Sequence, residues 1–420
     1  MRCARAGTSE WLRLRAGEVK VNPLQRLVAL DDEEKKRLGV EATPAEIAQQ
    51  PEMWRDTAAR LREAAPGIRE LLRGVALPGG AGEVVFCGAG TSDFVGRCVQ
   101  GPVTAALGTR GIAVPTTDVV THPECAFPAN RPGVMVSFAR SGNSPESAAA
   151  MEIALVERPE MRHLVITCNE EGELARRARA LGDRAYCLVL HPKTNDRGLA
   201  MTSSFSSMVV AGLGLAYLDR IEDYVALVER LATAGERVLE VAPDTAEALA
   251  KRRPQRACFL GSGSAYGAAV ESHLKLQELT DGGIICLCDT FLGIRHGPRA
   301  AIHEDTLVVS FVASDPQVRR YEVDLLRANR EQGVGLARVI AADRKEGLEE
   351  LADEMIEFDP EGKLGLPDGM LSPVYAIVGQ LLGVFASLEH GLKPDAPSAG
   401  GVIHRVVQGV TIYPRERRAR

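Results

Sequence analysis

The sequence contains two segments that match each other at one fixed distance, and this limits the folds that the chain can adopt. Val85–Gly90 has the pattern of a strand that ends in Gly-x-Gly, and Cys258–Gly263 repeats it 258 − 85 = 173 positions later. The same shift places Val136–Phe138 on Val309–Phe311, since 309 − 136 = 173. Two strand-like segments at one offset indicate a duplicated α/β unit. We therefore expect two related domains, with the functional site between them.

Strand-like runs alternate with helical patterns in both copies. The predicted strands lie near 84–87, 112–116, 133–138, 163–168, 184–190, 257–260, 284–288, 306–312, 336–341 and 355–358. Helices are predicted near 46–73, 92–107, 145–157, 171–181, 202–251 and 373–390. Short apolar strands that alternate with helices predict an α/β fold in which each domain is a parallel sheet with helices on both faces. The predicted divisions are an N-terminal segment (1–45), domain one (46–222), domain two (223–414) and a basic tail (415–420).

Two helix starts are marked by capping residues. Pro44 is typical of a first helical turn, and the preceding Thr43 is predicted to cap it. Met201–Ser204 has the composition of a capped start for the long helical region that follows.

Composition excludes several function classes. The 420-residue chain has 45% hydrophobic and 25% charged residues, as in ordinary globular proteins. Its net charge of −6 gives no general attraction to nucleic acid, and the basic run at 415–420 is interpreted as a solvated tail. No apolar stretch approaches the roughly 20 residues that cross a bilayer, and the N-terminus lacks the apolar core of a secretory signal. We expect neither a nucleic-acid nor a membrane partner.

The nine cysteines are scattered along the chain. Cys286 and Cys288 are the closest pair, but no second Cys or His pair follows at the spacing of a zinc site. Reduced, buried thiols in a strand are the favoured interpretation, which indicates a cytoplasmic protein without a metal site.

Neither Gly-x-Gly turn completes the fingerprint of a dinucleotide-binding fold. That fingerprint needs a third glycine three positions after the second, where this chain has Asp93 and Tyr266. No acidic residue ends a strand about 20 residues further on. The pattern disfavours a nicotinamide cofactor. For either copy alone, a tight turn without a ligand is the alternative.

A polar loop follows the second matching strand in the first copy only. It carries Arg140, Ser141, Asn143 and Ser144, and Pro145 then begins a helix. Proline at the first helical position, with Ser144 as cap, predicts free N–H groups at the positive end of the helix dipole. These donors, the hydroxyls and the arginine suit a phosphate dianion. A serine-rich cap is the alternative, but capping requires fewer of these residues, so phosphate binding is favoured.

Two further candidates lie in the second copy. Glu271, Lys275 and Glu278 fall on one helical face, although a surface ion pair worth about 0.2–0.5 kcal/mol explains such spacing equally well. His296 lies in the loop Gly293–Pro298 after an apolar strand, a position that often carries function in α/β folds. A hydrogen-bonded bystander is the alternative for this histidine.

As a set, these residues resemble the tandem form of the sugar isomerase (SIS) domain family. The strand-end signatures are Gly88–Ser92, Arg140–Ser144 and Gly261–Gly263. Glu271–Glu278 and Arg295–Pro298 look like the active-site helix and loop of the isomerase half of glucosamine-6-phosphate synthase. A closer resemblance is to the AgaS-type group of galactosamine-6-phosphate deaminase/isomerases, also called tagatose-6-phosphate ketose/aldose isomerases. The segments specific to that group are Pro115–Asp118, Asp196–Ser204 and Arg405–Val410, and the resemblance covers residues 50–414.

The resemblance implies a role for each candidate. Glu278 is implied as the proton-transferring base, His296 as the acid/base of ring opening, and Lys275 and Glu271 as supporting residues. The residues implied to hold the phosphate are Thr91, Ser92, Arg140, Ser141, Asn143 and Ser144. In the synthase a lysine near the C-terminus forms a Schiff base, whereas Gln408 stands at the corresponding position here. Because an amide cannot form that bond, we expect no covalent imine between enzyme and substrate.

The implied activity is amino-sugar phosphate catabolism without a cofactor, in which galactosamine 6-phosphate gives tagatose 6-phosphate and ammonia. The family also implies a homodimer. No glutamine-hydrolysing domain precedes the repeats, so ammonia-fed synthesis is not expected. The alternatives are aldose–ketose isomerisation without deamination, and a non-enzymatic sugar-phosphate regulator. Galacto and gluco substrates are not distinguished by the sequence.

Overall fold

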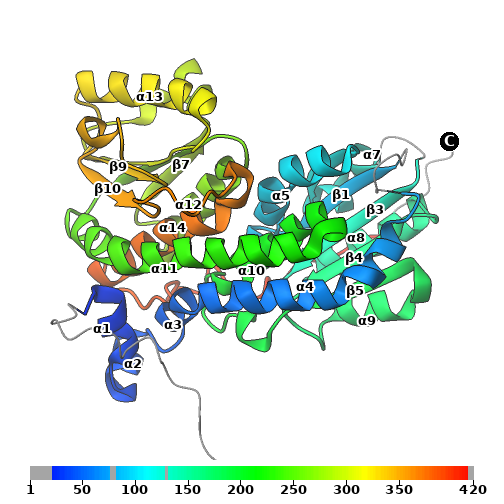
Figure 1. Ribbon diagram of the computed structural model, residues 1–420. Helices are drawn as coiled ribbons and strands as arrows, with labels where there is room; N and C mark the ends of the chain where they lie inside the picture. Colours follow the sequence, from blue (N-terminus) through cyan, green and yellow to red (C-terminus); the bar gives the residue numbers. More distant parts are fainter. Residues whose placement is uncertain (1–20, 76–81, 128–130, 415–420) are drawn as a thin grey trace, which may run out of the picture.

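The structure is a computed structural model that describes residues 21–75, 82–127 and 131–414 (Figure 1). It contains two five-stranded parallel sheets. In spatial order the first consists of β2 (Arg110–Pro115), β1 (Glu83–Gly88), β3 (Gly133–Ala139), β4 (Arg162–Thr167) and β5 (Ala185–Val189). The second consists of β10 (Glu354–Glu357), β9 (Ala337–Ala342), β8 (Thr306–Phe311), β6 (Arg256–Gly261) and β7 (Ile285–Asp289). The predicted strands are therefore confirmed. The predicted basic tail lies outside the described residues, as does the first part of the N-terminal segment.

The sheets repeat one topology, which confirms the duplicated unit. In each sheet the first strand along the chain, β1 or β6, lies second from one edge. The next strand, β2 or β7, forms that edge, and the remaining three strands follow in chain order on the other side of the first strand. The turns after β1 and β6 also agree, because Gly90 has φ 55° and ψ −127° while Gly263 has φ 57° and ψ −126°. Residues with a side chain rarely adopt this backbone conformation, so both turns require glycine.

The helices form three layers around the sheets. They are α1 (Pro23–Ala29), α2 (Asp32–Leu38), α3 (Thr43–Ala48), α4 (Gln50–Leu72), α5 (Thr91–Leu107), α6 (Thr116–Thr121), α7 (Pro123–Ala126), α8 (Pro145–Glu157), α9 (Glu173–Ala180), α10 (Ser203–Leu213), α11 (Ile221–Lys251), α12 (Ser264–Leu279), α13 (Pro316–Glu331) and α14 (Ser372–Glu389). One apolar core joins α4, α5, α10, α11, α12 and α14 to the inner faces of both sheets. The outer face of the first sheet packs on α6 to α9, and that of the second packs on α13 (Figure 1).

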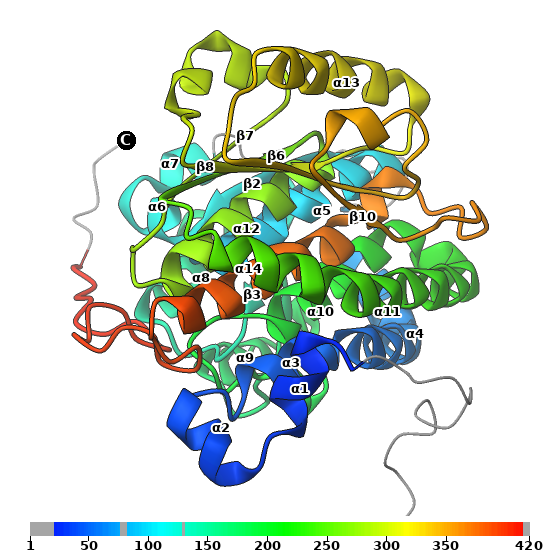
Figure 2. The same ribbon diagram turned by 90° about the vertical axis from the view of Figure 1, so that its left-hand side faces the viewer.

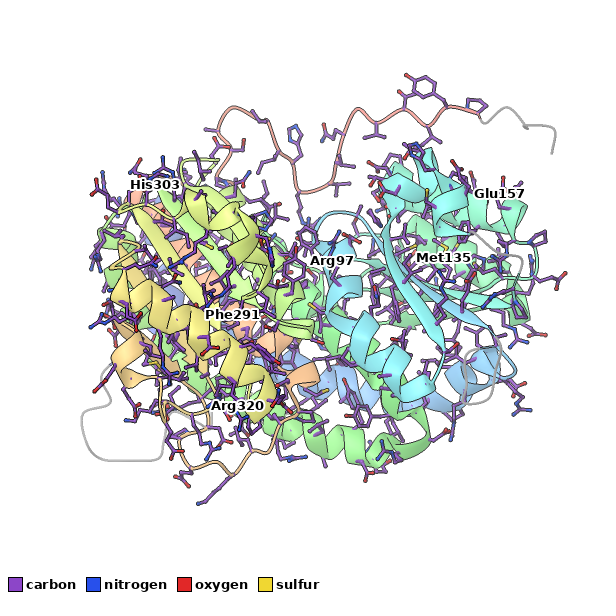
Figure 3. The ribbon with its side chains drawn as sticks, turned by 90° about the horizontal axis from the view of Figure 1, so that it is seen from above. Arg97, Met135, Glu157, Phe291, His303 and Arg320 are labelled. Carbon is purple, nitrogen blue, oxygen red and sulfur yellow. The ribbon has the colours of Figure 1, made fainter. Side chains whose placement is uncertain are left out.

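The two units meet where α5 packs against α12, the helices that follow the two Gly-x-Gly turns. A Cβ atom at Gly267 of α12 would lie 2.5 Å from the sulfur of Cys98 on α5 and 2.8 Å from its backbone nitrogen. Arg97, next to Cys98, lies at the junction between the two halves of the molecule (Figure 3). The glycine therefore permits a close approach, which brings one face of α12 against the middle of α5.

Helix α14 is a core helix. It has 18 residues and, among the described residues, is the one helix long and apolar enough to span a membrane by composition. However, 89% of it is buried within the chain, where it packs against α11 and α12. Its apolar character is therefore explained by its position in the core.

The start of α3 differs from the prediction. The helix begins at Thr43 itself, whose side chain caps nothing. Asp395, from the segment after α14, instead accepts the backbone N–H groups of Ala42 at 3.0 Å and Thr43 at 2.7 Å. The Thr43 hydroxyl also donates to Asp395 Oδ1 at 2.6 Å. The predicted cap is wrong because a carboxylate remote in sequence satisfies these N–H groups.

A carboxylate from the preceding loop caps α10. Thr202 occupies the N-cap position, but its side chain makes no capping bond. Asp196 Oδ2 accepts the backbone N–H groups of Thr202 and Ser204, both at 2.8 Å, and also the Ser204 hydroxyl. The loop before α10 is therefore folded back onto the helix that it precedes.

Residues 390–414 form an irregular C-terminal segment. It runs along one edge of the molecule from the second half to the first (Figures 2 and 3). At Arg405 it contacts two parts of the first unit, Arg140 after β3 and the loop before α10.

Candidate functional site

A cavity of about 440 Å³ lies at the carboxyl ends of β1 and β3. In an open parallel sheet this is the point where strand order reverses, and ligands bind outside the strand ends there. The polar residues that line the cavity are Thr91, Ser92, Thr117, Arg140, Ser141, Ser144, Glu146, Ser147, Lys275, Glu278, His404, Arg405 and Gln408. Both units and the C-terminal segment therefore contribute to it.

Hydroxyl groups and two helix starts form the first side of the cavity. Thr91 and Ser92 occupy the first turn of α5, directly after the glycine turn. Ser144 is the N-cap residue of α8 and Pro145 is its first residue, as predicted. The Ser144 hydroxyl contacts the Ser147 hydroxyl at 2.6 Å rather than capping the backbone. These hydroxyls and the positive ends of two helix dipoles are suited to an anion.

Arg140 is buried, with 7% of its surface exposed, and is held by backbone carbonyl groups. Its guanidinium donates to the carbonyl oxygens of Gly198 at 3.2 Å and Leu199 at 3.0 Å, and to that of Arg405. Burial lowers the pKa of Arg140, and the nearby charge of Arg405 lowers it further. The arginine therefore lines the cavity and also fixes two segments of its wall.

Asn143 is separated from the other predicted phosphate residues. It is exposed, does not line the cavity, and its Oδ1 accepts the backbone N–H of Glu173 at the start of α9. Its amide therefore links the polar loop to α9.

Glu271, Lys275 and Glu278 share one face of α12, as predicted. Lys275 Nζ lies 3.5 Å from Glu271 Oε1 and 2.5 Å from Glu278 Oε2. It also donates to the hydroxyl of Thr91 on α5 at 3.0 Å. The alternative of a surface ion pair is wrong, because the side chains of Lys275 and Glu271 are 1% and 0% exposed. Glu278, at 24%, has access to the cavity.

The environment of Glu271 favours its neutral form. Burial raises its pKa to about 8, although the charge of Lys275 acts in the opposite direction. Burial alone would lower the pKa of Lys275, but the carboxyl groups of Glu271 and Glu278 raise it overall. The lysine is therefore held as an ammonium group between two carboxyl groups, of which only Glu278 reaches the cavity.

The two histidines near this site differ in position. His296 lies in a 3-10 turn, η5 (Gly293–His296), where it is exposed and does not line the cavity of its own chain. His404, in the C-terminal segment, does line it.

His404 and Arg405 were not among the site residues predicted from the sequence, although both line the cavity. The Arg405 guanidinium donates to the carbonyl oxygen of Asp196 at 2.8 Å and to Asn195 Oδ1 at 2.8 Å. Its segment has no helical or strand period, so no pattern indicated where it folds. The one available signal was that Arg405–Val410 belongs to the family-specific motifs.

The corresponding strand-end loop of the second unit is occupied by the protein's own carboxylates. Glu322 Oε2 accepts the backbone N–H of Ala313 at 2.7 Å. Asp368 accepts those of Ser314 at 2.6 Å and Asp315 at 3.0 Å. The backbone N–H groups of this loop, which could otherwise bind an anion, are therefore already hydrogen-bonded to carboxylates of the same chain.

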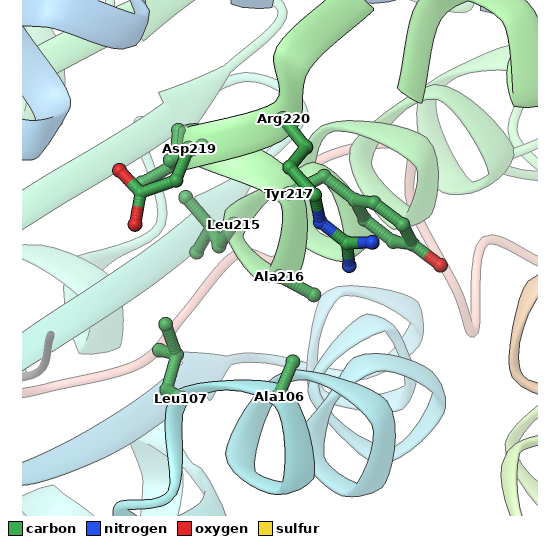
Figure 4. A pocket seen from close by; sticks show the side chains of 8 residues that line it. Ala106, Leu107, Leu215, Ala216, Tyr217, Asp219 and Arg220 are labelled. Atoms are coloured by element: carbon green, nitrogen blue, oxygen red, sulfur yellow. The ribbon is translucent and has the colours of Figure 1, made fainter. Parts of the chain in front are cut away.

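A smaller cavity, about 240 Å³, lies between the end of α5 and the 3-10 segment η4 (Gly214–Arg220) (Figure 4). The Arg220 guanidinium lies 5.5 Å from the ring centroid of Tyr217, and Asp219 lies 3.7 Å from Arg69. Since its charged groups have partners and it is remote from the strand ends, we place the site in the larger cavity. Within the described ranges, no group of three His, Cys, Asp or Glu residues is arranged to hold a metal ion.

Two parallel α/β units with a polar cavity at their strand ends define a tandem sugar isomerase-domain protein. No family model matches the sequence. The chain is 36% identical to the D-galactosamine-6-phosphate deaminase AgaS of Escherichia coli over 377 residues, covering 89% of this chain and 95% of that protein. A Streptomyces coelicolor protein provisionally named as the same deaminase is 41% identical over 374 residues, covering 88% and 95%. The chain belongs to the AgaS family.

A solved structure agrees with this assignment. A Clostridium novyi protein, provisionally named tagatose-6-phosphate ketose/aldose isomerase, is similar with a TM-score of 0.87 and 34% identity. The match covers 93% of this chain and 99% of that one. The similarity therefore includes both sheets and the segments that form the cavity.

Proposed function

We propose that the protein is a galactosamine-6-phosphate deaminase/isomerase that forms tagatose 6-phosphate and ammonia. The observation that carries the proposal is the contact of Lys275 with both Glu278 and Thr91. It places a carboxylate of the second unit beside the hydroxyl-rich anion pocket of the first. Galactosamine 6-phosphate, the compound in the names of the AgaS relatives, matches both parts of the cavity. Its phosphate suits the anion pocket, and in the open-chain form its C2 proton is acidic enough for a carboxylate to remove.

The phosphate would bind to the first unit. Thr91, Ser92, Ser141 and Ser144 supply hydroxyl groups at the two helix starts, and Arg140 supplies positive charge. Asn143 completes the proposed set by holding the loop to α9 rather than by lining the cavity.

The proton transfer would be carried out by Glu278. It removes the C2 proton of the open-chain aldehyde to give an enolamine and returns a proton to C1. The product is a ketimine with a hydroxyl at C1. Lys275 stabilises negative charge that develops on the C1 oxygen, and Glu271 supports the lysine from behind. Water then adds at C2 and ammonia leaves, so that amino sugar and water give ketose and ammonia.

Ring opening would need a second acid/base group. His296 is our proposed group, and because it is exposed and outside its own cavity, it can act only in the cavity of a second subunit. This is consistent with the homodimer that we expect in the cytoplasm. His404 is the candidate within the same chain. His296→Gln and His404→Gln variants distinguish them, since only loss of the true group slows turnover of cyclic substrate.

The direct test is to incubate the protein with galactosamine 6-phosphate and to measure ammonia and ketose together. Equal amounts of both support the proposal. A ketose formed from galactose 6-phosphate, with no ammonia from the amino sugar, would favour isomerisation alone, the activity in the name of the Clostridium novyi protein. Tight binding without any product would favour a regulator.

A further inference from the structure

Segment 197–199, part of the loop before α10, is held from opposite sides by two charged side chains. On one side, Glu46 of α3 accepts the backbone N–H of Arg197 at 2.6 Å through Oε1 and that of Gly198 at 3.3 Å through Oε2. On the other side, the Arg140 guanidinium donates to the carbonyl oxygens of Gly198 and Leu199. The carboxylate of Glu46 therefore holds backbone N–H groups of this segment, and the guanidinium of Arg140 holds its carbonyl groups.

The close approach of α3 to this segment depends on its glycine. A Cβ atom at Gly198 would lie 2.5 Å from the Thr43 hydroxyl and 3.2 Å from Glu46 Oε2. Glu46 is buried, and α3 is also fixed by Asp395, whose backbone carbonyl accepts the N–H of Leu199 at 3.0 Å. Leu199 lines the cavity. Helix α3, which has no other role in the proposed mechanism, is thus bonded to a segment that forms part of the cavity wall.

We propose that Glu46 is a positioning residue of the substrate site, which fixes segment 197–199 so that Arg140 is held toward the bound phosphate. This role depends on the proposed function in one respect, which is that the ligand is a sugar phosphate. Glu46 does not touch the substrate itself and acts through Arg140.

The charges around Glu46 make this role dependent on pH. The pKa of Glu46 is raised to about 7. Burial is the largest cause and the charges of Asp196 and Asp395 act in the same direction, while the two backbone N–H groups lower the pKa. Arg197 and Lys393 are the cationic side chains on the neighbouring segments; Arg197 Nη2 donates to the Glu41 carbonyl. Above pH 7 both oxygens of Glu46 accept hydrogen bonds. Below pH 7 one oxygen carries a proton and becomes a weak acceptor, so the charge-assisted hydrogen bond that it receives from the backbone is lost.

The test compares binding of galactosamine 6-phosphate with and without Glu46→Gln from pH 5.5 to pH 8.5, using calorimetry. Both proteins carry Glu278→Gln so that bound substrate is not turned over, and wild type in this comparison is the protein that retains Glu46. The ratio of the two Kd values cancels the titration of the substrate phosphate. We expect Glu46→Gln to bind about tenfold more weakly at pH 8.5, the effect of one charge-assisted hydrogen bond, and nearly as well as wild type at pH 5.5. The matched control is Glu52→Gln, whose exposed carboxylate pairs with Lys193 and leaves the ratio at one.

A ratio that does not change with pH would overturn the proposal, as would an unchanged affinity at pH 8.5. If Glu46→Gln does not fold, the same titration with Gly198→Ala replaces it, because the added Cβ would lie 3.2 Å from Glu46 Oε2 and would displace the segment that Glu46 holds. The ratio of its Kd to that of wild type should then fall as pH falls through 7, and a constant ratio overturns the role of Glu46. Because binding is measured without turnover, a protein that binds the ligand but releases no ammonia refutes only the proposed deamination. A wild type that does not bind the ligand at all refutes both.

Discussion

The ammonium group of Lys275 donates a hydrogen bond to the hydroxyl of Thr91 at 3.0 Å, although the two residues are 184 positions apart. The bond joins the helices that follow the two glycine turns, one from each unit. It therefore connects the part of the cavity suited to a phosphate with the carboxylates suited to proton transfer.

Replacing Glu278 by glutamine should separate chemistry from binding. The amide keeps the size of the side chain but cannot accept the C2 proton, so kcat should fall by about 10²–10⁴-fold. Calorimetry should show near wild-type affinity for galactosamine 6-phosphate. Gln277→Ala, at the exposed neighbouring position, is the control and should retain kcat. An unchanged kcat in Glu278→Gln would remove this residue from the mechanism.

Arg140→Ala should act mainly on KM. The variant loses positive charge in the cavity and three bonds to backbone carbonyl groups, so we expect KM for the sugar phosphate to rise about tenfold or more. Steady-state kinetics measure this change. Arg179→Ala, which removes a surface ion pair with Glu170, provides the comparison. A loss in kcat alone would argue against phosphate binding by Arg140.

Gly267→Ala should destabilise the contact between the two units. The added Cβ would meet the sulfur and backbone of Cys98, and such overpacking costs about 1–3 kcal/mol. Urea unfolding measures the loss. The matched variant is Gly101→Ala on α5, where a Cβ meets nothing within 4 Å and should stabilise the helix by roughly 0.5–1 kcal/mol. Equal effects of the two substitutions would contradict the close packing at Gly267.

Glu271→Gln should change how stability depends on pH. Because the pKa of Glu271 is raised from 4.5 to about 8, the folded protein binds its proton more tightly than the unfolded chain does. Wild type therefore loses stability as pH rises between those values. The variant lacks this loss, so its free energy of unfolding relative to wild type should increase from pH 5 to pH 8. Denaturant titrations measure the difference, and Glu240→Gln, at an exposed position, should show no such trend.

Local patterns were sufficient to predict the sheets and most helices. The range predicted for the helix after the polar loop matches α8, Pro145–Glu157, because proline and serine mark its start within the chain itself. The cap of α3 was mispredicted because its partner, Asp395, is distant in sequence. Capping patterns describe neighbours along the chain and contain no information on such contacts.

The candidate site was predictable to a similar extent. Spacing placed Glu271, Lys275 and Glu278 on one helical face, but only the packing of α12 on α5 distinguishes a buried cluster from a surface pair. The contribution of Arg405 depends on an irregular segment folding back over the first unit, for which no periodic pattern exists. For Asn143 the sequence indicates the chemistry but not the direction of the side chain, whose Oδ1 accepts the backbone N–H of Glu173 at the start of α9.

The strand-end loop of the second unit, bonded to Glu322 and Asp368, limits how many ligands one chain can hold. In that unit two side-chain carboxylates accept from the backbone N–H groups that would otherwise be free to bind an anion. The titration endpoint with a sugar phosphate should accordingly be one molecule for each chain. Under the proposed function the two units therefore have different tasks, since the first binds the substrate phosphate and the second supplies the groups for proton transfer.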